Sequence, residues 1–247
     1  MRPWSSRSRG GCWWLLGLTL LAAPVHSAVF GGDDRETFDE LGAYLNSQLE
    51  RAVGTITCFD GHVSSAFVVD IDDYVETPPS FYVLATTANA LYDISTGLSR
   101  GRCAFSPAFA ADIQVEITEH LMGSKRVTGV KDDDWLFARV DGDLARVSPL
   151  PILFGDIYNF DPDLDRDLQA VGYADDLNAM SLTDDCQLDD KARYESQWQL
   201  QHELSKMILH DCDFTGSAWG GPLALEFEGT IQVIGMHAGD GRYELGD

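Results

Sequence analysis

The chain has 247 residues, of which 40 are acidic and 17 basic, so its formal net charge is −23. Hydrophobic residues make up 45% and charged residues 23%, a composition typical of globular proteins and not of disordered ones. The excess of acid argues against nucleic acid, and against an anionic membrane surface, as the main partner, because phosphate binding needs a basic face.

The first 27 residues have the pattern of a signal peptide. Three arginines precede an apolar run at 12–23, and Val25-His-Ser27 places small residues before Ala28. The run is too short to cross a bilayer, which needs about 20 apolar residues. We expect cleavage before Ala28 and a secreted or periplasmic protein with no membrane span; an uncleaved anchor is the alternative. The mature chain would carry 14 basic and 40 acidic residues, a formal charge of −26.

One helix is expected to open the mature chain. Asp33 and Glu36 have the spacing of a capping box, and Gly54 can end the helix. Apolar residues between these points fall on one helical stripe, which predicts packing against the rest of the domain: Phe38, Leu41, Leu45 and Leu49.

Beyond Gly54 the pattern changes to short apolar runs separated by turn residues such as Asp60-Gly61 and Glu228-Gly229. Many short strands at this spacing predict an all-β barrel or sandwich. The stretch 148–151, Ser-Pro-Leu-Pro, is the best connection between two halves of similar size. The predicted strands are Thr55–Cys58, Ala66–Ile71, Phe81–Thr86, Ile113–Ile117, Trp135–Val140, Pro151–Phe154, Leu168–Tyr173, Lys206–His210, Pro222–Phe227 and Thr230–Met236.

Four cysteines remain after the signal: Cys58, Cys103, Cys186 and Cys212. An even number in an exported chain predicts two disulfides, and four cysteines allow three pairings. We expect Cys58–Cys103 and Cys186–Cys212, which keep one bridge in each half. Zinc is a weak alternative, since no CxxC or HxxxH spacing occurs. No metal and no cofactor is expected.

Alternating acids at 161–167 suggest a calcium loop. The EF-hand pattern needs Gly at its sixth position and Glu at its twelfth, where this chain has Arg166 and Gly172. We therefore predict a solvated acidic loop.

Three segments together resemble the chymotrypsin-like (trypsin-fold) serine peptidases, especially their bacterial secreted branch. They are 82–93 with Thr86-Thr-Ala-Asn-Ala-Leu91, 134–140 with Asp134-Trp-Leu-Phe-Ala-Arg-Val, and 210–223 ending in Trp219-Gly-Gly-Pro-Leu, followed by Val233-Ile-Gly-Met-His237. The resemblance covers the mature chain. It implies two packed six-stranded antiparallel β-barrels after the N-terminal helix, at about 52–147 and about 148–247.

The resemblance also assigns the catalytic positions, and two of the three are changed. The acid is kept as Asp134, the base position holds Asn89 and the nucleophile position holds Trp219. A neutral amide cannot accept and return a proton near neutral pH, and an indole has no atom with which to attack a carbonyl. The chain is therefore interpreted as a degenerate member, a pseudopeptidase, in which Asp134 becomes a structural carboxylate near Asn89. Gly220 and Gly221 would preserve the shape of the oxyanion loop.

Alternatives stay open at this point. Ser217 lies two residues before the nucleophile position and could act in a rearranged hydrolase site, with a displaced base such as His62. His120, His202, His210 and His237 are further histidines without a position fixed by sequence. A binding or regulatory protein for a peptide or protein partner is preferred, and a decaying duplicate without a role is the third hypothesis.

Overall fold

The computed structural model describes residues 33–41, 47–72, 80–126, 133–142, 144, 146–153, 168–188, 210–227 and 229–238. The predicted signal peptide, the acidic loop 161–167 and most of the expected strand Lys206–His210 lie outside these residues.

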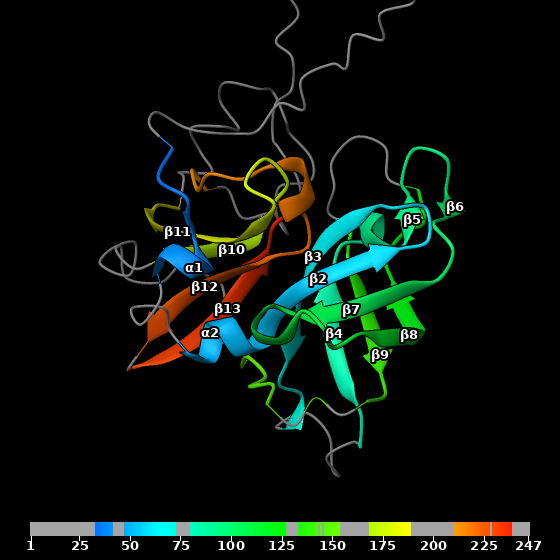
Figure 1. Cartoon of the computed structure of the whole chain (residues 1–247), viewed down its shortest axis with the longest axis horizontal. Coiled ribbons are helices and arrows are strands. Elements are labelled where there is room, and N and C mark those ends of the chain that lie inside the picture. Colours follow the sequence, from blue (N-terminus) through cyan, green and yellow to red (C-terminus); the bar gives the residue numbers. More distant parts are fainter. Residues whose placement is uncertain are drawn as a thin grey trace, which may run out of the picture.

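Six strands of the first half close into an antiparallel barrel in the order β2-β3-β4-β9-β8-β7 (Figure 1). Side chains alternate along them as the pleat requires: on β9, Leu136, Ala138 and Val140 are buried and Phe137 is exposed. The strands are β2 (Val53–Cys58), β3 (Val63–Val69), β4 (Tyr82–Thr86), β7 (Cys103–Pro107), β8 (Val115–Met122) and β9 (Leu136–Val140).

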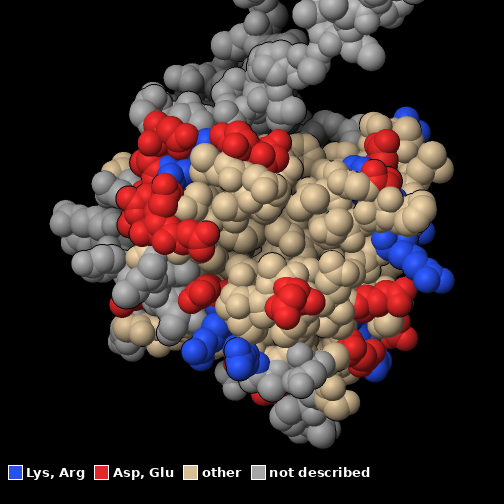
Figure 2. Space-filling view, viewed as in Figure 1, with Lys and Arg blue, Asp and Glu red and all other residues tan. Residues whose placement is uncertain are grey.

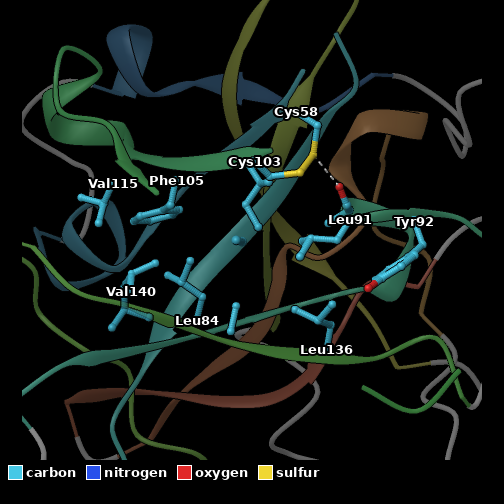
Figure 3. Close-up of a cluster of buried hydrophobic side chains, with 14 of the residues drawn as sticks. Cys58, Leu84, Leu91, Tyr92, Cys103, Phe105, Val115, Leu136 and Val140 are labelled. Atoms are coloured by element: carbon cyan, nitrogen blue, oxygen red, sulfur yellow. Dashed lines mark hydrogen bonds between the residues drawn. A yellow bond between two sulfur atoms is a disulfide. The ribbon is translucent and has the colours of Figure 1, made fainter. Parts of the chain in front are cut away.

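The inward side chains fill the barrel (Figure 3). Phe105, Leu84 and Leu136 are at most 1% exposed, and burying such a side chain contributes about 1.5–3 kcal/mol. Cys58 and Cys103 face each other across β2 and β7 and form a disulfide. A short hairpin of β5 (Tyr92–Asp93) and β6 (Leu98–Ser99) extends from one end of the barrel.

The described part of the second half is a five-stranded sheet in the order β1-β11-β10-β12-β13. Its core lies around the second disulfide, Cys186–Cys212. Both expected pairings of cysteine are thus confirmed, and the all-β class with them; two disulfides are typical of a protein outside the reducing cytoplasm. The strands are β1 (Glu36–Thr37), β10 (Leu168–Ala174), β11 (Ala179–Cys186), β12 (Pro222–Phe227) and β13 (Thr230–Met236).

The two halves share one apolar interface. Phe67 and Val69 of β3 are buried in the same cluster as Val171 of β10 and Val233 of β13. The segment 147–153 runs between the sheets, since Leu150 N donates to Val68 O at 2.9 Å and Leu153 N donates to Val233 O at 2.8 Å.

The N-terminal segment differs from the single helix that the stripe predicts. The structure has β1, then α1 (Phe38–Leu41) and α2 (Ser47–Ala52), with 42–46 outside the described residues. Glu36 pairs with Leu182 of β11 and is not available as a capping residue. The reciprocal cap is instead made by Thr37 and Glu40: Thr37 N donates to Glu40 Oε2 at 2.9 Å, and Glu40 N donates to Thr37 Oγ1 at 3.4 Å.

A buried arginine fixes this segment to the second half. The Arg35 side chain is 2% exposed and makes ion pairs of 2.7 Å with Asp33 and with Asp176, which lies in the β10–β11 turn. Such charge-assisted pairs have strict geometry, so the segment is held in register beside β11. In the described part of the chain, no helix is long and apolar enough to cross a membrane.

Candidate active site

Asn89 and Asp134 meet at one end of the first barrel. Asn89 lies in the 3-10 turn Ala88–Ala90 directly after β4, and Asp134 precedes β9. Because β4 and β9 are paired neighbours, the two residues come together, and Asn89 N donates to Asp134 Oδ1 at 3.1 Å. Asn89 is 7% exposed and Asp134 1%. The carboxylate thus orients the backbone of the residue at the base position.

The side chain of Asn89 is bound by the guanidinium of Arg100, a residue that no sequence motif indicated. Arg100 donates from Nη2 to Asn89 Oδ1 at 2.9 Å and from Nε to Asn89 O at 2.8 Å. Its Nη1 contacts Asp60 Oδ2 at 3.1 Å, and the arginine side chain is only 15% exposed. Arginine keeps its charge at every physiological pH. Asn89 therefore presents an amide oxygen that is bound to a permanent cation.

The β5–β6 hairpin delivers Arg100. The chain reverses at Asp93–Gly97, where Gly97 N donates to Asp93 O at 2.6 Å, and Arg100 N then donates to Leu91 O at 2.9 Å. Asp93 and Gly97 are residues that favour turns, so the sequence does contain a signal for this turn. That signal does not show which side chain the hairpin brings next to Asn89.

Trp219 ends the 3-10 turn Gly216–Ala218 and is half-buried. Backbone bonds fix the loop around it: Ser65 N donates to Trp219 O at 3.0 Å, and Gly220 N donates to His237 O at 2.8 Å. Trp219 is therefore held between β3 of the first half and the end of β13.

Gly220 is required by close packing. Its φ is +91°, a region that side-chain-bearing residues avoid, and a Cβ there would overlap Ser65 O and Thr86 Oγ1. A Cβ on Gly221 would overlap Val171 O. Thr86 lies three residues before Asn89. The close packing of Gly220 against Thr86 therefore places the loop of Trp219 beside the turn of Asn89.

The alternative site is placed differently. Ser217 is half-buried and its carbonyl accepts a 3.1 Å bond from Ser65 Oγ. The ring of His62 bonds Ser64 Oγ through Nε2 at 2.8 Å. Burial, reinforced by the Arg100 charge, lowers the pKa of His62 to about 4, so this imidazole is neutral at pH 7. Ser64, its partner, is 1% exposed and closed to a substrate.

The other described histidines contact groups elsewhere. His120 Nε2 lies 3.0 Å from Tyr92 Oη, and His237 Nδ1 lies 3.4 Å from His210 Nε2. His202 is outside the described residues. Within the described part of the chain, no group of three or more His, Cys, Asp or Glu residues could hold a metal ion.

Comparisons with known proteins identify the fold. No family model matches the chain, and no curated protein matches it. The thermostable serine protease AL20 from an extremophilic microorganism is 15% identical, with 80% of this chain and 88% of that chain covered and a TM-score of 0.51. The protease Anisep from Arthrobacter nicotinovorans is 16% identical, with 76% and 86% covered and a TM-score of 0.50. The chain therefore has the fold of the bacterial trypsin-like serine proteases.

Proposed function

We propose that the protein is a non-hydrolytic member of this fold that binds a peptide or protein partner outside the cytoplasm. The observation that carries the proposal is the Arg100 bond to Asn89 Oδ1. General base catalysis needs a group that gains a proton in the transition state. An amide oxygen bound to a guanidinium cannot do so.

The nucleophile position supports the same conclusion. Trp219 offers no oxygen or sulfur, and its backbone is fixed by the bonds to Ser65 and at Gly220. Loss of triad members leaves only about 10³–10⁴-fold acceleration over water. What the fold keeps is the scaffold on which a partner could bind, for example by addition of a strand to a sheet edge.

A fluorophosphonate probe and a quenched peptide library test the loss of hydrolysis. We expect no labelling above that of heat-denatured protein and no cleavage. The control variants are Ser217→Ala and, at a half-buried serine of β7, Ser106→Ala. Labelling or cleavage that Ser217→Ala abolishes and Ser106→Ala leaves intact would overturn the proposal in favour of a rearranged hydrolase.

A further inference from the structure

Two apolar side chains project into solvent from one end of the first barrel. Phe59, in the β2–β3 turn, is 89% exposed, and Leu98, on β6, is 68% exposed. The loops that carry them are joined, because Phe59 N donates to Arg102 O at 2.8 Å and Arg100 bonds Asp60 beside Phe59. Exposed side chains of this size on connected loops are typical of an interaction site.

Basic residues gather around the same hairpin. Lys125 Nζ lies 5.1 Å from the centre of the Tyr92 ring, and Arg126 packs with its Cβ against Gly97. The described residues include eight Lys and Arg, and four of them surround this hairpin: Arg100, Arg102, Lys125 and Arg126. We call these four residues with Phe59 and Leu98 the barrel tip.

The cations of the barrel tip are not equally neutralised. Asp60 is bound by Arg100, and Glu116 lies 4.0 Å from Arg102. Asp93 accepts bonds from Ser95 N and Ser95 Oγ. Within the described residues, neither Lys125 nor Arg126 is paired with a carboxylate. Among the described residues, these two cations stand next to the exposed apolar side chains, where a ligand carboxylate could pair with them.

Another region of the surface is mainly acidic. Acidic side chains gather over α1 and β11, whereas blue side chains lie at the margin near β5 and β6 (Figure 2). The acidic residues of that region include Asp33, Asp34, Glu36, Asp175, Asp176 and Asp184. Because charge is screened within about 8–10 Å at physiological salt, a ligand at the barrel tip meets mainly its local cations.

We infer that the barrel tip binds an acidic polypeptide segment that carries apolar side chains. Its carboxylates would pair with Lys125 and Arg126, and its apolar side chains would bury Phe59 and Leu98. An anionic lipid surface fits less well, because attraction to it grows with the local excess of cations, and here Asp60, Asp93 and Glu116 offset three of the four. This inference does not depend on the loss of hydrolysis, since these contacts lie outside the pair Asn89–Asp134.

The probe is a fluorescein-labelled peptide of alternating Asp and Leu, measured by fluorescence anisotropy with the mature protein; the same peptide with Lys for Asp is the negative control. Phe59→Ser combined with Leu98→Ser should weaken binding at least about tenfold, since both apolar side chains would lose their burial against the peptide. Lys125→Glu with Arg126→Glu should weaken it similarly and reduce its salt dependence. Arg100 stays unchanged because it also holds Asn89.

Control residues lie away from the barrel tip. Leu177, in the β10–β11 turn of the second half, is 40% exposed, so Leu177→Ser removes an exposed apolar side chain there. Arg51→Glu combined with Arg146→Glu, both at exposed positions, makes the same total charge change of two reversed cations. Neither should alter binding, and circular dichroism should show every variant folded.

Any one of four results would overturn the inference. The first three are no binding of the Asp–Leu peptide by the parent, equal loss in the Leu177→Ser control, and binding to phosphatidylglycerol vesicles in place of the peptide. Self-association in sedimentation that the tip variants abolish, without peptide binding, would assign the surface to a second copy and equally overturn it. Because labelling by fluorophosphonate is scored separately, failure here is distinguishable from failure of the proposed function.

Discussion

Arg100 would affect how well a histidine placed at residue 89 could act as a general base. A histidine placed at Asn89 would stand between Asp134 and a new hydroxyl at Trp219, as a triad requires. It would also stand beside the guanidinium that now bonds Asn89. A neighbouring positive charge opposes formation of the imidazolium, which the general base must become in the transition state.

We therefore predict that Asn89→His with Trp219→Ser hydrolyses an activated ester only weakly, and that adding Arg100→Leu raises the rate at least about tenfold, the effect of about 1.4 kcal/mol. Each single reversion should show none, because triad members act as a unit. Initial rates of p-nitrophenyl ester hydrolysis by folded variants measure this. A double variant as active as the triple would show that Arg100 is no obstacle.

A second prediction concerns the stability lost when Gly220 is replaced by alanine. Gly220→Ala combines an unfavourable φ of +91° with overlap at Ser65 O and Thr86 Oγ1. The φ alone costs about 1–2 kcal/mol, and forced overlap adds typically about 1–3 kcal/mol. Gly229 has a φ of +77°, and a Cβ added there would meet nothing within 4 Å, so Gly229→Ala isolates the backbone cost.

Urea unfolding of both variants separates the two contributions. Gly220→Ala should lose clearly more stability than Gly229→Ala. Equal losses would mean that the loop shifts freely at Ser65 and that its packing does not fix the nucleophile position.

The contact of Asn89 with Asp134 could be predicted from sequence because each follows or precedes a strand with a recognisable motif. Arg100 could not, because its position depends on the return path of the β5–β6 hairpin and not on any spacing to Asn89. That no catalytic triad is intact stays a prediction, which the assays above test. It assigns Asn89, Asp134 and Trp219 to triad-equivalent positions, Ser217 as the alternative nucleophile, and Gly220 and Gly221 to the oxyanion loop.

Among the elements, the strands that sequence missed have identifiable causes. β7, Cys-Ala-Phe-Ser-Pro, contains no β-branched residue and ends in proline, yet alternates buried and half-buried side chains. β11 contains Asp184, which favours loops by propensity. In both strands, pairing with neighbours outweighed local preference, whereas β12 and β13 were predictable from their apolar content.

The N-terminal segment should make stability depend on pH. Partial burial, together with hydrogen bonding to and repulsion by Asp213, raises the pKa of Asp34 from 3.8 to about 6, and Asp184 adds repulsion. Asp213 itself is 2% exposed and its Oδ2 accepts from Asp34 N at 3.4 Å. Arg35, next in the chain, is committed to Asp33 and Asp176.

The folded state therefore holds the Asp34 proton more tightly than the unfolded state does. Its contribution is fully present below pH 3.8 and is lost as pH rises to about 6. His62 acts in the opposite direction, since its lowered pKa of about 4 makes stability rise with pH up to its unfolded value near 6.5. The two effects overlap in one window, so a variant is needed to separate them.

We predict that the melting temperature of Asp34→Asn rises relative to that of the parent as the pH increases from 3.8 to about 6. Thermal melts of parent and variant across the window measure the difference. His62→Gln should show the reverse relative change. Superimposable profiles for Asp34→Asn and parent would mean that the Asp34–Asp213 contact carries no proton linkage.

At the scale of the whole molecule, charge opposes compactness. The formal net charge is −23, and acidic side chains gather over α1 and β11 (Figure 2). Self-repulsion of this kind weakens the folded state and is screened by salt. The prediction is that NaCl raises the melting temperature, with sucrose at equal osmolality as the control for a general exclusion effect. A melting temperature that falls or stays constant in NaCl would show that local ion pairs such as Arg35–Asp176 outweigh the net charge.

The two-part architecture was accessible from sequence because motif order and the stretch 148–151 divide the chain, and the connecting residues do run between the sheets. The sequence did not predict that β1 forms an edge of the second sheet. The identity of that strand depends on a pairing between segments far apart in the chain, which no local pattern encodes.

That pairing has a consequence for assembly. β1 lies opposite Leu182 and Ser181, whereas every barrel strand lies between residues 53 and 140. The barrel strands thus follow one another in the chain and can pair without the second sheet, whereas β1 must reach from residue 36 to its partner at residue 182. Closing so long a loop costs chain entropy that shorter loops avoid. We therefore expect the barrel to close first and β1 to dock onto β11 late.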